Sequence, residues 1–280
     1  MFKKFHFIRI VAISLSFSLT ITGIFAQMDG DEYTPYSGQA GKDVVWVPTP
    51  QELVDAMLDI ANVTSNDYVI DLGSGDGRLV ITAAKRGAKA FGIEYNPDMV
   101  ELAKRNANKE GVSDRVKFEN ADLFETDFSE ATVLTMFLLH SINLQLRPTI
   151  LDMKPGTRVV SNTFDMDDWK PDRTMQIRES SGSWDTALLW IVPAKVNGTW
   201  KLDEGEINFI QEFQTVSGTM TIGNKSMILT GRLDGNKISF NAGGTEYTGT
   251  VNGDTISGTR SFEIGKISKG AKAGFWKATR

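Results

Sequence analysis

The chain has 280 residues, of which 41% are hydrophobic and 23% charged, and its formal net charge is −5. This is the composition of a globular protein, long enough for one large domain and one small one. The acidic balance argues against a general nucleic-acid-binding protein, which would carry a basic face. The absence of cysteine excludes disulfides, thiolate metal sites and cysteine nucleophiles, and we expect no metal site.

The first 26 residues form a segment of their own. Lys3, Lys4 and Arg9 make its start basic, and residues 10–25 carry no charge. This pattern is typical of a secretory signal peptide, so we expect a protein that is exported, to the periplasm in a bacterium. An uncleaved membrane anchor is one alternative, because the segment nearly reaches spanning length, and a mitochondrial presequence is another in a eukaryote. The polar residues 27–44 then predict a linker.

A helix is expected after this linker. In the segment Trp46-Val47-Pro48-Thr49-Pro50, Thr49 is placed to be the N-cap and Pro50 the first helical residue. Glu52 would complete a capping box with Thr49.

The most informative segment is residues 69–78, which read Val-Ile-Asp-Leu-Gly-Ser-Gly-Asp-Gly-Arg. Its first two residues end a buried strand, its glycines make a tight turn, and the apolar residues 79–84 follow with helical spacing up to Gly87. Strand, glycine turn and helix allow a nucleotide-like ligand to lie against bare backbone. A dinucleotide site would need its third glycine at position 78, where Arg78 stands.

The observed spacing is Asp71-x-Gly73-x-Gly75-x-Gly77, which resembles the first motif of class I S-adenosylmethionine-dependent methyltransferases. A glycine turn in another α/β protein is the competing interpretation. The resemblance covers about residues 45–194. It implies an α/β fold, a Rossmann-like seven-stranded sheet with helices on both faces, and S-adenosyl-L-methionine as the cofactor.

Two acids follow at the family's spacing. Residues 90–94 read as the next strand and end at Glu94, where an acid accepts hydrogen bonds from ribose hydroxyls. Asn96 and Pro97 predict the start of the next helix. After a third strand at 116–118 comes Asp122, to which the resemblance assigns the adenine amino group. The expected cofactor-binding residues are Asp71, Leu72, Gly73, Ser74, Gly75, Gly77, Glu94, Tyr95, Asp122 and Leu123.

Further strands are expected near residues 131–136, 158–161, 175–179 and 187–192, the last two as an antiparallel hairpin. After Pro193 the sequence becomes rich in glycine, and residues 230–239 (TGRLDGNKIS) resemble residues 248–257 (TGTVNGDTIS). Each copy reads as two strands around an Asp-Gly or Asn-Gly turn. We therefore expect residues 195–280 to form a small antiparallel all-β accessory domain, a meander that makes a barrel or a sandwich.

The residues after the expected fourth strand bear on the methyl acceptor. They read Thr135-Met136-Phe137-Leu138-Leu139-His140, without the proline pair typical of methyltransferases that act on nucleobase or glutamine amino groups. With the Val-Pro-Thr-Pro of residues 47–50 and with Asn143, this segment resembles the protein-lysine methyltransferases related to the enzyme that modifies the ATP synthase c-subunit. The resemblance implies a protein lysine as acceptor, with catalytic residues Thr135, Phe137 and Asn143 and channel residues Trp46, Pro48 and Thr49.

Other interpretations of the sequence stay open. The chain is alternatively a small-molecule or lipid methyltransferase, or an exported binding protein that keeps the fold without the chemistry. His140, the only histidine outside residues 1–26, is either a general base or a residue at a helix start without a chemical role. Nucleic acid is not expected as a partner, and any membrane association would pass through the N-terminal segment.

Overall fold

A computed structural model describes residues 33–177, 184–262 and 274–280. The expected leader, residues 1–26, lies outside the described residues. The chain divides into two compact units, residues 1–34 and 35–280, and the second contains the elements described below. Within the described residues, no helix has the length and the apolar character needed to cross a membrane.

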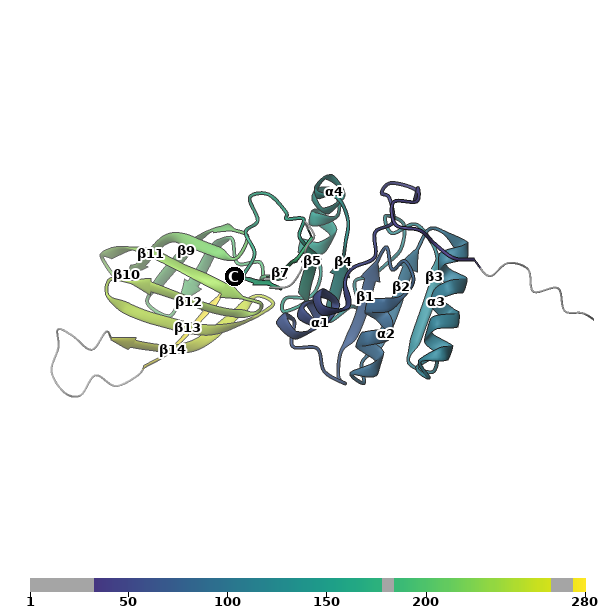
Figure 1. The fold of residues 1–280 in the computed structure, drawn as a ribbon. Helices are drawn as coiled ribbons and strands as arrows, with labels where there is room; N and C mark the ends of the chain where they lie inside the picture. Colours follow the sequence, from purple (N-terminus) through teal and green to yellow (C-terminus); the bar gives the residue numbers. More distant parts are fainter. Residues whose placement is uncertain (1–32, 178–183, 263–273) are drawn as a thin grey trace, which may run out of the picture. The chain divides into compact units, whose positions relative to one another are not determined.

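A seven-stranded mixed sheet confirms the expected fold class (Figure 1). Its strand order is β3-β2-β1-β4-β5-β7-β6. Neighbouring strands from β3 to β5 are parallel, whereas β7 runs antiparallel to both β5 and β6, as the expected hairpin requires. The strands are β1 (Tyr68–Leu72), β2 (Lys89–Glu94), β3 (Val116–Asn120), β4 (Val133–Met136), β5 (Arg158–Asn162), β6 (Arg173–Gln176) and β7 (Thr186–Ile191).

Helices cover both faces of this sheet. Three of them, α1 (Gln51–Ile60), α2 (Arg78–Lys85) and α3 (Pro97–Lys109), share a buried core with Val69 of β1. The fourth, α4 (His140–Leu151), packs in the opposite core with Ile70 of the same strand. Successive strand residues point to opposite faces, so β1 is buried on both sides and its carboxyl end is held rigidly.

The two expected helix starts have different outcomes. The side chain of Asn96 accepts hydrogen bonds from the backbone N–H groups of Asp98 and Met99, which confirms it as the N-cap of α3. The capping box on Thr49 is wrong. Helix α1 begins at Gln51, because Pro50 has an extended backbone (ψ 142°) and is itself the N-cap.

The expected linker is partly folded. In a segment that we call the strap (residues 38–48), the N–H of Gly38 donates to the carbonyl of Trp46 at 2.8 Å, and the N–H of Trp46 donates to the carbonyl of Gln39 at 2.9 Å. Ala40 and Val45 form a β-bridge inside it. A plain linker would not make these bonds, so this part of the segment belongs to the folded unit.

An antiparallel barrel closed by eight strands follows the sheet and confirms the expected all-β domain (Figure 1). The turns of the internal repeat contain Gly235 and Gly253, whose φ angles of 58° and 56° suit tight hairpins. Aromatic side chains of the barrel, among them Trp200, Phe209 and Phe240, are buried in its core. The strands are β8 (Gly198–Leu202), β9 (Gly205–Glu212), β10 (Thr215–Ile222), β11 (Lys225–Asp234), β12 (Lys237–Ala242), β13 (Thr245–Asn252), β14 (Thr255–Phe262) and β15 (Gly274–Thr279).

Candidate functional site

The glycine turn connects β1 to α2. Gly73, Gly75 and Gly77 have φ angles of 75°, 53° and 81°, a region that other residues rarely adopt. A Cβ atom on Gly75 would lie 2.6 Å from Nε1 of Trp46, so this glycine lets the strap approach the turn. A Cβ atom on Gly77 would lie 2.8 Å from Cζ of Phe118, so that glycine serves the packing beneath the turn.

Glu94 stands at the end of β2, beside the glycine turn. Its Oε2 accepts a hydrogen bond from the N–H of Gly75, and its Oε1 accepts one from the N–H of Asn96, both at 2.9 Å. Each carboxylate oxygen has two acceptor sites, so both oxygens can accept a second hydrogen bond. The backbone thus orients this carboxylate for the hydroxyls of a ribose.

Asp71 is buried at the carboxyl end of β1. Its Oδ1 accepts a hydrogen bond from Oγ1 of Thr135 on the neighbouring strand β4, at 2.7 Å. Burial raises the pKa of Asp71 to about 7, and the hydrogen bond from Thr135 opposes this rise. The groups that shift its pKa include no cation, so this buried carboxylate fits the ammonium group of an amino-acid-like ligand.

A cavity of about 410 Å³ brings many of the expected residues together. Its lining includes the expected cofactor residues Asp71, Gly73, Ser74, Gly75, Glu94, Tyr95, Asp122 and Leu123, and the expected acceptor-side residues Trp46, Pro48, Thr49 and Phe137. Leu72, Gly77, Thr135 and Asn143 do not line it. Leu72, Thr135 and Asn143 are fully buried, so they can act on a ligand only through the residues that they support.

S-adenosylmethionine fits this cavity by its hydrogen-bonding groups. The ammonium would face Asp71, the ribose would face Glu94, and the adenine amino group would face Asp122. In addition, Oγ of Ser74 is buried and has no hydrogen-bond partner among the described residues. A buried hydroxyl of this kind is usually satisfied by a ligand or water, and here a ligand carboxylate would satisfy it.

Lys42, on the strap, is a residue of the site that sequence reasoning missed. Its Nζ forms an ion pair with Oδ2 of Asp122 and lies 4.9 Å from the ring centroid of Tyr95. The hydrogen bond between them lowers the pKa of Asp122 and raises that of Lys42. Lys42 belongs to a segment that the sequence predicts to be only a linker, and no motif marks it.

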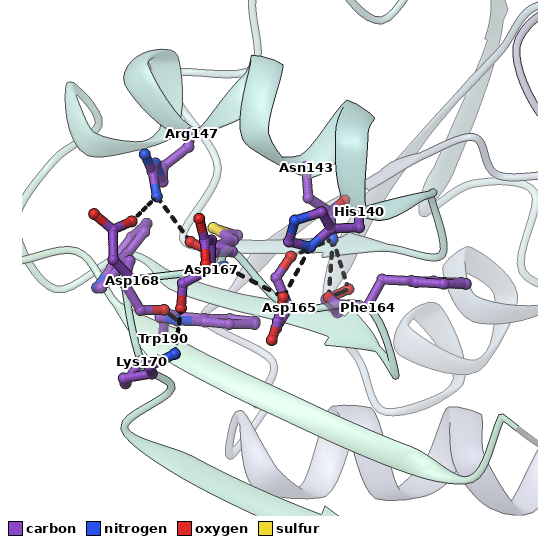
Figure 2. Close-up of polar contacts among 12 residues, drawn as sticks. His140, Asn143, Arg147, Phe164, Asp165, Asp167, Asp168, Lys170 and Trp190 are labelled. Carbon is purple, nitrogen blue, oxygen red and sulfur yellow. Dashed lines mark hydrogen bonds and ion pairs between the residues drawn. The ribbon is translucent and has the colours of Figure 1, made fainter.

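Asn143, expected to be catalytic, supports the segment after β5. Its Nδ2 donates to the carbonyl of Phe164 at 2.9 Å, as Figure 2 shows, and Oγ of Ser161 donates to the same carbonyl at 2.7 Å. Oδ1 of Asn143 is buried and has no partner among the described residues. The side chain therefore fixes the backbone that carries Phe164.

His140 is the first residue of α4 and points toward the same segment (Figure 2). Its Nδ1 lies 2.8 Å from Oδ1 of Asp165, and both side chains are about half exposed. Leu139, its neighbour in the chain, lines the cavity, whereas His140 does not. The pair thus lies beside the cavity rather than in it.

Three aromatic side chains, which we call the aromatic wall, line another part of the cavity: Phe137, Phe164 and Trp184. The rings of Phe137 and Phe164 are stacked with centroids 6.1 Å apart, and Trp184 meets Phe137 edge-on at 5.9 Å. Only Phe137 was expected in the site. The one signal for the other two is that each stands directly before an aspartate, in the pairs Phe164-Asp165 and Trp184-Asp185.

Comparisons with known proteins agree with this geometry. A family model described as the ANTKMT methyltransferase domain matches residues 71–173. A protein-lysine N-methyltransferase of Saccharolobus islandicus is 43% identical over 152 residues, which are 53% of this chain and 94% of that protein. The lysine N-methyltransferase of the ATP synthase c-subunit from Rattus norvegicus is 36% identical over 144 residues, which are 50% of this chain and 66% of that protein.

A solved structure also resembles the sheet domain. It is an RNA methyltransferase from Salinibacter ruber in complex with S-adenosyl-L-homocysteine, 49% identical, with a TM-score of 0.51 over 54% of this chain and 96% of that one. The demethylated cofactor bound there supports S-adenosylmethionine as the cofactor here. The chain is therefore an S-adenosylmethionine-dependent methyltransferase of class I, and it belongs to the family of the protein-lysine N-methyltransferases related to the enzyme for the ATP synthase c-subunit.

Proposed function

We propose that this enzyme methylates the ε-amino group of lysine in a protein. The observation that carries the proposal is the apolar lining of the cavity beyond the cofactor residues, which the aromatic wall and Leu138 dominate. Such a lining suits the four-carbon stem of lysine. The relatives from Saccharolobus islandicus and Rattus norvegicus, both named for lysine methylation, support the same acceptor.

The residues of the chain divide the work between two ligands. When bound, S-adenosylmethionine supplies an activated methyl group, and Asp71, Glu94 and Asp122 would hold and orient it. Lysine has a reference pKa of about 10.4, so the amine must lose a proton before it can react. Leu138 and Ile142 are almost fully buried in the lining and disfavour a charged amine there, and the proton leaves to water at the open side of the cavity.

An RNA acceptor is the rival suggested by the relative from Salinibacter ruber. Two observations speak against it here. The chain carries a net charge of −5, and the aromatic wall is flanked by the carboxylates of Asp165 and Asp185. An RNA backbone would be repelled by such a surface, whereas the cation of lysine would be attracted.

The test is transfer of labelled methyl groups from S-adenosylmethionine by the purified full chain. The acceptors are a protein extract, the same extract with its lysines blocked by reductive alkylation, total RNA and lipid vesicles. We expect label on lysine, mapped by mass spectrometry, and none in the blocked extract. Label confined to RNA, lipid or carboxylates would reject a lysine acceptor.

We also propose that residues 1–26 direct export. The support is their basic start and the uncharged residues 10–25. Mass analysis of the native protein should find an N-terminus near Gln27, or the complete N-terminus in the membrane fraction. Full-length protein in the cytosol would contradict both forms of the proposal.

A further inference from the structure

The acceptor side of the cavity has an open mouth and a closed interior. Trp184 is the most exposed member of the aromatic wall, with 39% of its surface accessible, whereas Leu138 is only 3% exposed. Trp184 lies just before β7, outside the residues 71–173 that match the family model. The chain thus adds an aromatic residue of its own at the mouth of the cavity.

The rings around this mouth offer a surface that binds cations. Trp184 meets Phe137 edge-on at an interplanar angle of 64°, so the two rings face different directions across the same wall. An ammonium ion is attracted to the face of an aromatic ring, most strongly to that of tryptophan. A neutral hydroxyl or amide receives no such attraction, so a wall of this kind discriminates by charge.

Carboxylates strengthen this preference. Asp185 follows Trp184 in the chain and is held by hydrogen bonds from Nε2 of Gln176 at 2.9 Å and from Oγ1 of Thr186 at 2.8 Å. Asp165 follows Phe164 and is paired with His140. Both aspartates lie next to wall residues without lining the cavity themselves.

We propose that Trp184 is a specificity-determining residue, whose indole binds the alkylammonium group of the acceptor at the mouth of the cavity. This inference rests on the proposed lysine acceptor, but it makes a separate statement about recognition. The acceptor enters as a cation against Trp184, and the apolar interior then favours its neutral form. Acceptors that carry no positive charge lose the first of these two steps.

The test uses choline and its uncharged carbon isostere, 3,3-dimethyl-1-butanol, as probes of the full chain saturated with S-adenosyl-L-homocysteine. By calorimetry, choline should bind at least about tenfold more tightly than the isostere. In Trp184→Leu, which keeps the apolar bulk, choline affinity should fall about five- to tenfold while the isostere is little affected. Trp184→Phe should lie between the two proteins, and Phe275→Leu, at an exposed aromatic residue of the barrel, is the matched control.

Equal binding of both probes would overturn the inference, and so would unchanged choline binding in Trp184→Leu. If only Asp185→Asn and Asp165→Asn weaken choline, the recognition is carried by the carboxylates and the inference is wrong. These readouts need no turnover. Trp184-dependent choline binding without any methylated lysine would therefore reject the proposed acceptor and leave the recognition of alkylammonium groups standing.

Discussion

Thr135 on β4 donates a hydrogen bond to the carboxylate of Asp71 on β1, and both side chains are buried behind the glycine turn. The two residues are direct partners in the register of the two parallel strands. Since Thr135 does not line the cavity, it acts on the ligand through Asp71. The hydrogen bond stabilises the ionised form of Asp71 against the cost of burial.

Cofactor affinity is predicted to fall with pH below neutrality. The pKa of Asp71 is about 7 in the free protein, and the ammonium group of the ligand favours the ionised carboxylate. Below pH 7 the site must first lose a proton, so the affinity for S-adenosyl-L-homocysteine should drop about tenfold between pH 8 and pH 6. Calorimetry across this range measures it. Thr135→Val removes a bond that lowers the pKa of Asp71, so the midpoint of the fall should move to higher pH.

Asp71→Asn is the control for this prediction. The variant should bind the ligand weakly and with little dependence on pH. Its free form should be more stable than the wild type at pH 8, by about 2–4 kcal/mol, because it buries no charge. The sign follows from a folded-state pKa above the unfolded value, so the advantage should shrink below pH 7 and vanish below pH 4. A wild-type affinity that is flat from pH 8 to pH 6 would contradict this account of Asp71.

Lys42→Met is predicted to tighten cofactor binding. Lys42 holds one oxygen of Asp122, and the other accepts a hydrogen bond from the N–H of Phe124 at 3.0 Å. An adenine amino group must share this carboxylate, so removing the lysine should raise the affinity about two- to fivefold. Salt should raise the affinity of the wild type and leave the variant unchanged, because screening weakens an exposed ion pair. Weaker binding in Lys42→Met would show that the strap holds the ligand instead.

The sequence predicts the cofactor side of the site well because its residues stand at fixed points of a repeated unit. Asp71 and Glu94 end neighbouring parallel strands, and Asp122 follows the next one, so their spacing along the chain sets their positions in space. The alternation of strands and helices predicts the sheet for the same reason. Periodic hairpin turns predict the barrel in a similar way.

The acceptor side could not be predicted to the same extent. Trp184 reaches the cavity only because β7 inserts next to β5, and Lys42 only because the strap folds back over the site. Both placements depend on tertiary packing and leave no periodic signal in the sequence. Asn143 was predicted as a residue of the site, but its buried bonds to the backbone of Phe164 follow from the path of the chain after β5.

Gly77→Ala is predicted to destabilise the fold without emptying the cofactor site. The residue has a φ of 81°, and an added Cβ would lie 2.8 Å from Phe118 and 2.9 Å from Ala103. Strain and overpacking together should lower the free energy of unfolding by about 2–4 kcal/mol. Gly111→Ala is the matched control, since its φ is 69° but nothing lies within 4 Å of the added atom. Lost binding of S-adenosyl-L-homocysteine at an unchanged melting temperature would instead assign Gly77 to the cofactor.

Asn143→Ala is predicted to weaken acceptor binding more than cofactor binding. The change removes the donor that holds the carbonyl of Phe164, so the ring of Phe164 would lose its fixed place in the aromatic wall. The KM for a lysine-containing acceptor should rise, the affinity for S-adenosyl-L-homocysteine should stay near that of the wild type, and the free energy of unfolding should fall by about 1–3 kcal/mol.

Ser161→Ala separates this positioning role from a direct one. Its hydroxyl donates to the same carbonyl, so it should raise KM in the same direction. If Asn143 instead accepted a hydrogen bond from the reacting amine, only Asn143→Ala would lower kcat, and kcat/KM would fall with it while KM stayed constant. Steady-state kinetics of the two variants therefore decides whether Asn143 holds the aromatic wall or touches the acceptor.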